Sequence, residues 1–370
     1  MKNKLRFLAL LLCLCQILCL VGCGNDPAPT SPTTEPTVTT APPTEPTKPE
    51  EVSKVIPWGA DGSIAEQAKA AGEMIICFMS GEGTQISGGD SSTAYSDTKW
   101  GDSTLIAFPN GELMLIDGGM SDYAPLLIEN LQSLGVTRLD YVVLSHRHND
   151  HYGGLLRLHG VLESFEIGVV YTSGVYNGNA SDPLQLEGKT GNLGIPHQVL
   201  RKGEVLNIGD VKIEVLWPQP ELIGTNDPDT EDVNSSSLVL RFDYKDVSAL
   251  FAGDLYIGGE QALLNDVGAE KLDVDILKIP HHGRSTSSSR NFVEAVSPEV
   301  AVALGAIIME TTVYTTYARF GARVFMDVYD GYVIVRTNGT DITWQTSRVR
   351  DVAAYDKLDA AFNINRESMN

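Results

Sequence analysis

The chain has 370 residues, 42% of them hydrophobic, so it is long enough to bury a large core in one generous domain or in two smaller ones. Its formal net charge is −21, from 48 acidic residues against 27 basic ones. Such an excess of negative charge argues against passive binding of nucleic acid or of an anionic membrane, so metal ions would have to hold any polyanion.

The first 22 residues are predicted to be a signal peptide. Three basic residues lie within the first six, and residues 7–21 are apolar apart from Gln16, which is too short for a spanning helix. The stretch ends in Leu20-Val21-Gly22-Cys23, which resembles the bacterial lipobox and implies cleavage before Cys23 and lipidation of its thiol. An ordinary secretory signal is the alternative. Removal of this segment leaves 24 basic and 48 acidic residues, a formal charge of −24.

Residues 23–57 are rich in Pro, Thr, Ser and Glu and contain almost no large apolar side chain. This composition predicts a disordered, extended tether that would hold the following domain away from a membrane. We place the folded domain at 58–350 and a helix or tail at 351–370. Cys77 is the one cysteine left in that domain, so it is predicted to be a buried small hydrophobe rather than half of a disulfide.

Hydrophobic patterning then predicts strands and helices in a mixed order. In chain order we expect a helix at 65–71, a strand at 74–79, a surface loop at 81–99, a hairpin at 103–108 and 112–116, a helix at 123–134, a strand at 140–144 and a helix at 155–162. Further strands are expected at 166–171, 211–216, 238–244, 248–252, 274–279 and 300–304, followed by an antiparallel set at 323–345. Hairpins with interspersed helices favour an α+β fold of mixed sheets covered by helices.

Five of the seven histidines fall into two clusters, each directly after a predicted buried strand. The clusters consist of His146, His148 and His151 with Asp150, and of His281 with His282. Structural histidines are usually solitary, so clusters at strand ends indicate a site. Imidazoles and carboxylates are good ligands for zinc, manganese or iron. Four such groups within six residues exceed what one ion takes from so short a stretch, which predicts a two-ion site.

Another predicted strand, 248–252, stops at Gly253-Asp254. A carboxylate in this position could bridge two ions. Taken alone, Gly-Asp is a weak signal and Asp254 would be read as an ordinary turn residue. It gains weight because the two histidine clusters also follow predicted strands.

Together these motifs resemble the metallo-β-lactamase fold superfamily, and most closely its ComEC-like branch, the soluble domain of DNA-uptake competence proteins and its stand-alone relatives. The resemblance spans about residues 74–345 and is carried by the stretches 115–119, 146–151, 234–240, 251–254 and 277–283. It implies an αββα sandwich with metals at one edge of the sheets. It also implies hydrolysis as the reaction class, most often of phosphoesters in this branch.

The same resemblance implies roles for the site residues. His146 and His148 would hold one ion, Asp150 and His151 would hold the second, and Asp254 would bridge the two.

The pair His281-His282 would supply the last ligand. We favour His281, which is nearer the strand end, with His282 as ligand or proton donor. Asp117 would orient the histidine stretch from behind, and Lys278 would either support the ligands or face the substrate. The residues expected to act directly in catalysis are Asp150, Asp254 and His282.

The sequence departs from most of the superfamily ahead of the Gly-Asp strand, where another histidine is usual and residues 232–237 contain none. The ComEC-like branch shares this absence. The first ion therefore lacks a ligand that Asp232, Asn234 or water would have to supply. His197, expected in a loop, is a less favoured candidate, and His159 is expected on a helix surface.

These observations predict an extracytoplasmic hydrolase, lipid-anchored to the outer face of the bacterial cell membrane. It would hold two divalent ions, zinc first and manganese or iron as alternatives, and would use a metal-activated water. A phosphodiester is the favoured substrate, either a teichoic-acid or phosphocholine-type wall polymer or extracellular nucleic acid. The alternatives are a β-lactamase-like amide or ester hydrolase and a non-catalytic, wall-tethered binding module. No protein partner is predicted.

Overall fold

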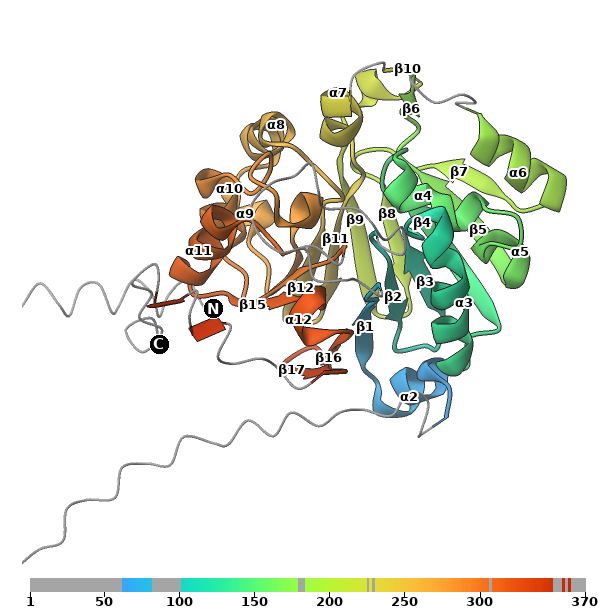
Figure 1. Ribbon diagram of the computed structural model, residues 1–370, viewed down its shortest axis with the longest axis horizontal. Coiled ribbons are helices and arrows are strands. Elements are labelled where there is room, and N and C mark those ends of the chain that lie inside the picture. Colours follow the sequence, from blue (N-terminus) through green and yellow to red (C-terminus); the bar gives the residue numbers. More distant parts are fainter. Residues whose placement is uncertain are drawn as a thin grey trace, which may run out of the picture. The chain divides into compact units, whose positions relative to one another are not determined.

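Two β-sheets lie at the centre of the computed structural model of the chain, with helices on both sides (Figure 1). The structure describes residues 62–81, 101–178, 184–224, 226–227, 230–305, 308–348, 355–356 and 359–360. All of them belong to one compact unit, Val52–Asn370. The predicted signal peptide, Cys23, the tether, most of the loop at 81–99 and most of the tail lie outside the described residues, so the domain limits stay predictions.

The first sheet has eight strands in the order β17-β16-β1-β2-β3-β4-β5-β7. Their bounds are β1 Met74–Phe78, β2 Thr104–Ala107, β3 Leu113–Ile116, β4 Arg138–Leu144, β5 Glu166–Thr172, β7 His197–Val199, β16 Val333–Thr337 and β17 Ile342–Thr346. The run from β3 to β7 is parallel, and the other pairings are antiparallel. The carboxyl ends of β3 and β4 therefore lie side by side.

The second sheet has seven strands in the order β15-β14-β13-β12-β11-β9-β8. Their bounds are β8 Val205–Ile208, β9 Val211–Trp217, β11 Val239–Tyr244, β12 Val247–Phe251, β13 Ile276–Lys278, β14 Val300–Ala303 and β15 Arg323–Met326. Strands β12 to β15 run parallel, so β12 and β13 end at the same edge. A short parallel ribbon pairs β6 (Tyr176–Asn177) with β10 (Asn226–Asp227).

Helices cover the outer faces of both sheets. The described helices are α2 Ile64–Ala71, α3 Ala124–Ser133, α4 Asn149–Leu156, α5 Val161–Ser164, α6 Gln185–Leu193, α7 Thr230–Ser235, α8 Ile257–Val267, α9 Ala269–Leu272, α10 Arg290–Val296, α11 Thr311–Arg319 and α12 Asp327–Asp330, with 3-10 turns η2 Ser121–Tyr123, η3 Pro220–Leu222 and η4 Pro280–Gly283. Side chains from α2 to α6 share one apolar cluster with the first sheet, and side chains from α8 to α12 share another with the second.

Alternation along the strands explains the layering. In β1 the side chains of Met74, Ile76 and Phe78 join the cluster between the sheets, whereas Ile75 and Cys77 join the helix-covered cluster. A strand that is apolar on both faces needs cover on both faces, which a helix layer and a second sheet supply. The predicted αββα sandwich is thus confirmed, and Cys77 is buried as expected.

Three local predictions are wrong. The single helix expected at 155–162 is two helices, α4 and α5, separated by a turn in which His159 has φ 58° and is exposed, not on a helix. The antiparallel set expected at 323–345 is divided, because β15 runs parallel to β14 in the second sheet and only β16 and β17 form the hairpin. His197 begins β7 rather than standing in a loop. The errors at β15 and β7 concern pairings between segments distant in sequence, which local pattern does not specify, whereas the break between α4 and α5 is a local turn.

Among the described residues, the structure contains no helix with both the length and the apolar character needed to cross a membrane.

The aromatic contact between the sheets yields a stability prediction. Phe78 is fully buried, and its ring stacks at 6.2 Å on Phe251 of the facing sheet. Phe78→Ala should lower the free energy of unfolding by about 3–5 kcal/mol, because it leaves a cavity in a packed core. Chemical denaturation measures the change. Leu158→Ala is the control: its side chain is 71% exposed, so the change should stay within about 0.5 kcal/mol. Equal losses in both variants would contradict this packing.

Candidate metal centre

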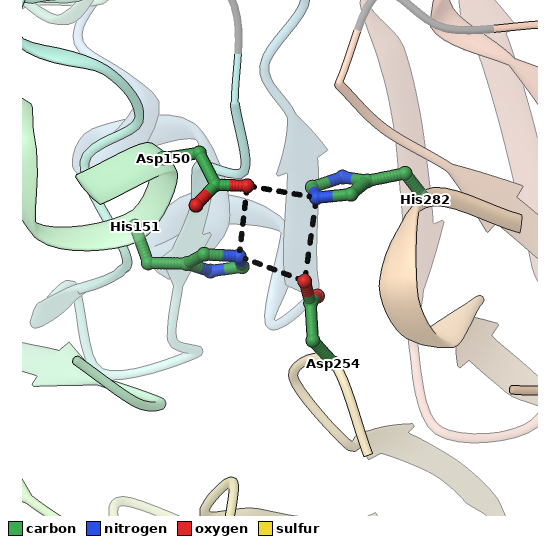
Figure 2. A group of neighbouring side chains, drawn as sticks. All are labelled: Asp150, His151, Asp254 and His282. Carbon is green, nitrogen blue, oxygen red and sulfur yellow. Dashed lines mark hydrogen bonds and ion pairs between the residues drawn. The ribbon is translucent and has the colours of Figure 1, made fainter. Parts of the chain in front are cut away.

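Four side chains from three segments converge at the edge where the parallel strands end. Asp150 and His151 lie in the first turn of α4, Asp254 follows β12, and His282 lies in η4 after β13. Figure 2 shows all four directed toward a common point. One ligand atom from each lies within 4.8 Å of the others, so the group could hold a metal ion. The histidine stretch is not a loop throughout, because α4 begins at Asn149 inside it.

The distances within this group are those of close polar contact. The Nε2 atom of His282 lies 3.1 Å from Oδ2 of Asp150 and 3.3 Å from Oδ2 of Asp254. The Nε2 atom of His151 lies 3.2 Å from the same Asp254 oxygen and 3.8 Å from Oδ2 of Asp150. Two imidazoles and two carboxylates therefore present one atom each around a shared space, which is the donor set that divalent transition metals prefer.

Asp117 fixes the orientation of His151 from behind. Its Oδ1 accepts from the Ser145 amide at 2.8 Å, and its Oδ2 accepts from the Ser145 hydroxyl at 2.7 Å and from His151 Nδ1 at 2.8 Å. Because Nδ1 carries the donated proton, Nε2 presents a lone pair to Asp150 and Asp254. That Nε2 is buried and makes no hydrogen bond in the described structure. A lone pair facing two carboxylates needs positive charge beside it, and a metal ion bound by all three groups would supply that charge.

Asp102 was not predicted, and its negative charge faces the second histidine. Its Oδ1 lies 3.1 Å from Nδ1 of His282, and its Oδ2 pairs with the ammonium of Lys278. These contacts are charge pairs without hydrogen-bond geometry. The Lys278 Nζ also donates to the Gly253 carbonyl at 3.0 Å and lies 3.5 Å from Oδ1 of Asp254. Lys278 therefore holds the ligand segment at Gly253 and Asp254 in place. Asp102 and Lys278 also line a small cavity next to the site.

Gly101 carries the sequence signal that could have revealed Asp102. The amide of Asp102 donates to the Asp150 carbonyl at 3.1 Å, which draws the two segments together. Gly101 has φ 116°, and a Cβ there would lie 2.3 Å from the same carbonyl oxygen. A Gly-Asp pair beside a strand, as at 253–254, marks a close backbone approach with a carboxylate at its end.

Burial and charge act in opposite directions on these groups. Burial opposes ionisation of Asp254, yet His151, His282 and Lys278 together hold the pKa of its carboxyl well below the ordinary value. Burial also disfavours the charged form of His151, but Asp254, Asp117 and Asp150 raise its pKa well above the ordinary value. The carboxylates thus draw positive charge into the site, whether as a proton or as a metal ion.

The two neighbouring histidines of η4 have different environments. His281 has φ 47° and His282 has φ 55°, so the backbone turns in the left-handed region and directs the two rings apart. His282 enters the group of four. The His281 ring contacts that of Tyr256 in a tilted arrangement, with centroids 4.8 Å apart. Its Nδ1 contacts the Thr286 hydroxyl at 2.5 Å, and its Nε2 lies 4.0 Å from Asp254. The preference for His281 as the last ligand is therefore wrong on geometry, since His282 lies closer to the other ligand atoms.

His146 and His148 lie beside the group of four but are not part of it. Their rings are 4.7 Å apart, and the His146 ring is 4.1 Å from that of His151. His197 does not join them, because it lies in β7 and its Nε2 contacts the Thr172 hydroxyl at 3.1 Å. The chain thus separates the predicted ligands into a compact set of four and a pair beside it.

Arg147, between these two histidines, points the opposite way. Its guanidinium donates to Glu187 of α6 at 3.1 Å and lies 4.5 Å from the Tyr176 ring of β6. Its backbone carbonyl accepts from the side-chain amide of Asn177 at 3.0 Å. Helix α6 and strand β6, which lie beside the site, are therefore attached directly to the histidine stretch.

With this geometry in place, the comparisons with known proteins can be stated. The family model described as the Metallo-beta-lactamase superfamily matches residues 101–306. The chain belongs to the metallo-β-lactamase superfamily. The matched range covers Asp102, the histidine stretch, Asp254 and the η4 pair, so the group of four lies inside the family domain.

Two of its curated relatives are competence proteins, as predicted. The chain is 28% identical to ComE operon protein 3 of Bacillus subtilis (strain 168) over 225 residues, which cover 56% of the chain and 27% of that protein. It is 31% identical to Competence protein ComA of Neisseria gonorrhoeae over 214 residues, covering 56% and 26%. The chain thus spans about a quarter of the length of the relatives it matches. These matches confirm the resemblance to the ComEC-like branch.

A solved structure with a similar fold is the metallo-beta-lactamase fold protein YhfI from Bacillus subtilis, at 13% identity and TM-score 0.41, covering 69% of this chain and 95% of that one. A second is described as a new diphosphatase from the PhnP family, at 14% identity and TM-score 0.36, covering 62% and 85%.

Glu260 of α8 stabilises the segment at Ser288 and Ser289, which follows η4. Its carboxylate accepts from the backbone amides of Ser288 and Ser289, the second at 2.9 Å. The side chain is fully buried, and burial raises its pKa to about 7. No sequence motif pointed to this residue.

Asp117→Asn tests the orienting role of the first carboxylate. The amide cannot accept from both Ser145 and His151 as the carboxylate does, so His151 should lose its fixed tautomer. We expect metal affinity, measured by competition with a chelator, to fall by roughly 10–100-fold. The control is Asp122→Asn, whose side chain is 61% exposed, and its affinity should match the wild type. Unchanged affinity in Asp117→Asn would remove Asp117 from the site.

Glu260 makes stability depend on pH with a defined sign. Its pKa is raised on folding, so ionisation favours the unfolded chain. The contribution of Glu260 to the free energy of unfolding should be greatest below pH 4.5 and should fall by about 3 kcal/mol as the pH rises through about 7. Denaturation of the metal-free protein at several pH values measures this. Glu260→Gln lacks the titration, so the difference in stability between the two proteins should change across the same window, and a constant difference would refute the assignment.

Proposed function

We propose that this protein is a metal-dependent phosphodiesterase that acts outside the cytoplasm. The observation that carries the proposal is the unpartnered Nε2 of His151 within a ring of carboxylates. Asp102, Asp117, Asp150 and Asp254 bring four carboxylates to the site, against the ammonium of Lys278. With neutral imidazoles three negative charges stay unbalanced, which is costly at this degree of burial without divalent cations.

The residues divide the binding work between two positions. Asp150, His151, Asp254 and His282 would hold one divalent ion, and His146 with His148 would contribute to a second, with Asp254 between them. Zinc is the first candidate, and manganese or iron are alternatives. Such ions supply Lewis acidity that activates water and polarises a substrate oxygen.

Neighbouring residues of the chain orient these ligands and fix the tautomers of the histidines. Asp117 keeps His151 in one tautomer, and the Leu304 carbonyl, 3.2 Å from Nδ1, does so for His282. Lys278 holds one oxygen of Asp254, which leaves Oδ2 directed into the site. No serine or cysteine nucleophile is needed for hydrolysis by water.

Charge favours an anionic substrate. Two divalent ions outweigh the three unbalanced carboxylates, so the loaded site is locally positive in a chain whose net charge is −21. A phosphodiester fits that local field, whereas a long polyanion is repelled elsewhere on the surface. Both wall polymers of the teichoic-acid or phosphocholine type and extracellular nucleic acid fit this class, and the competence proteins among the relatives support the latter.

The location rests on the N-terminal sequence. The lipobox-like stretch ending at Cys23 and the Pro- and Thr-rich tether after it support anchoring through a lipid on the outer face of the cell membrane. The site would then reach wall-associated or extracellular substrates without a protein partner.

The purified protein loaded with manganese or zinc should hydrolyse bis-p-nitrophenyl phosphate. Asp254→Ala should reduce kcat/KM by more than about a hundredfold, because it removes a ligand at the centre of the site. Asp210→Ala, in the exposed β8–β9 turn, is the control and should retain full activity. Hydrolysis of a β-lactam but not of the phosphodiester would favour the amide hydrolase alternative. Absence of both turnover and bound metal by elemental analysis would favour a binding module.

A further inference from the structure

Asn234, in the last turn of α7, carries a second unpartnered polar atom next to the site. The residue is 2% exposed, and its Oδ1 makes no hydrogen bond in the described part of the chain. A buried amide oxygen without a donor destabilises the fold unless a ligand satisfies it. Asn130, the other asparagine in a buried position of a described helix, instead donates to the hydroxyl of Tyr332.

The segment that follows α7 is fixed between the two halves of the site. The amide of Leu238 donates to the Ser145 carbonyl at 2.8 Å, and the amide of Asp254 donates to the Ser237 hydroxyl at 3.1 Å. A Cβ on Gly253 would lie 2.8 Å from the Ser237 Cβ and 3.1 Å from the Ser145 Cβ. Three segments therefore meet closely here, with Asn234 directly before them and its side chain against His148.

Hydrogen bonds determine which nitrogen of His146 carries the proton and which carries the lone pair. The Ser145 hydroxyl donates to the Asp117 carboxylate, so it can only accept from Nδ1 of His146, at 3.1 Å. Nε2 of His146 consequently holds a lone pair, and it lies 3.0 Å from Nδ1 of His148.

We infer that Asn234 Oδ1 joins His146 and His148 as a ligand of the second ion. The inference rests on the proposed function and gives that ion its missing donor. Two imidazoles with one amide oxygen form a harder and weaker donor set than three imidazoles. Oxygen donors suit manganese, whereas nitrogen-rich sets favour zinc. The site formed by His146, His148 and Asn234 should therefore bind Mn²⁺ and release it more readily than the group of four around His151.

Equilibrium dialysis of the full chain against Mn²⁺, with elemental analysis, tests this directly. The wild type should bind two ions per chain with unequal affinity. Asn234→Leu keeps the shape but removes the donor, so it should retain one ion and weaken the second by at least about tenfold. Asn234→Asp keeps an oxygen donor and should bind both. The spin-coupled electron paramagnetic resonance signal of paired Mn²⁺ should persist in Asn234→Asp and give way to an isolated Mn²⁺ signal in Asn234→Leu.

Asn130→Leu is the matched control, because it also removes a buried asparagine from a helix and should bind two ions. Two ions of wild-type affinity in Asn234→Leu would overturn the inference. A wild type that binds one ion, unchanged in Asn234→Leu, would overturn it as well while leaving a one-ion hydrolase intact. A wild type that binds no ion would overturn the proposed function itself. If Asn234→Leu does not fold, Asn234→His still decides: it should raise Zn²⁺ affinity at the second position by at least about tenfold, and an unchanged affinity would overturn the inference.

Discussion

The hydrogen bond from His151 Nδ1 to Asp117, 2.8 Å long, is the interaction on which the site depends. It assigns the proton to one side of the ring and the lone pair to the other. Asp117 can make it because φ 60° turns its carboxylate back under the neighbouring strand end, where the Ser145 amide and hydroxyl also bind it. A carboxylate that accepts three hydrogen bonds is held in one position, so His151 keeps its direction even before an ion arrives.

The sandwich supplies the site from both sheets. The first sheet delivers Asp117 and the histidine stretch, and the second delivers Asp254, Lys278 and His282. The Asp102–Lys278 ion pair connects the two sheets next to the site, since Asp102 precedes β2 of one sheet and Lys278 ends β13 of the other. Removing either partner would leave the other charge buried and unpaired, which is a severe penalty. Packing between the sheets and the geometry of the ligands are therefore coupled through the same edge.

Backbone strain is concentrated around the last ligand. His281 and His282 both adopt positive φ, and Ser288 follows with φ 64° where its amide binds Glu260. Non-glycine residues hold such conformations only when surrounding contacts outweigh the strain. Here Thr286, Tyr256 and the Glu260 carboxylate supply those contacts. As a result, His281 and His282 face different surroundings although they are adjacent in the sequence.

The sequence by itself determined most of the strands, a fold of mixed sheets covered by helices and most of the residues that approach the site, because apolar alternation and clustered histidines are local signals. The αββα class followed from the resemblance of its motifs to a known family. Only the tertiary structure showed that His282 rather than His281 meets Asp150, a contact between residues 132 positions apart. The same holds for Asp102, Glu260, the unpartnered oxygen of Asn234, and the place of β15 in the second sheet. Each depends on which distant backbone lies alongside, and no local pattern of residues encodes that pairing.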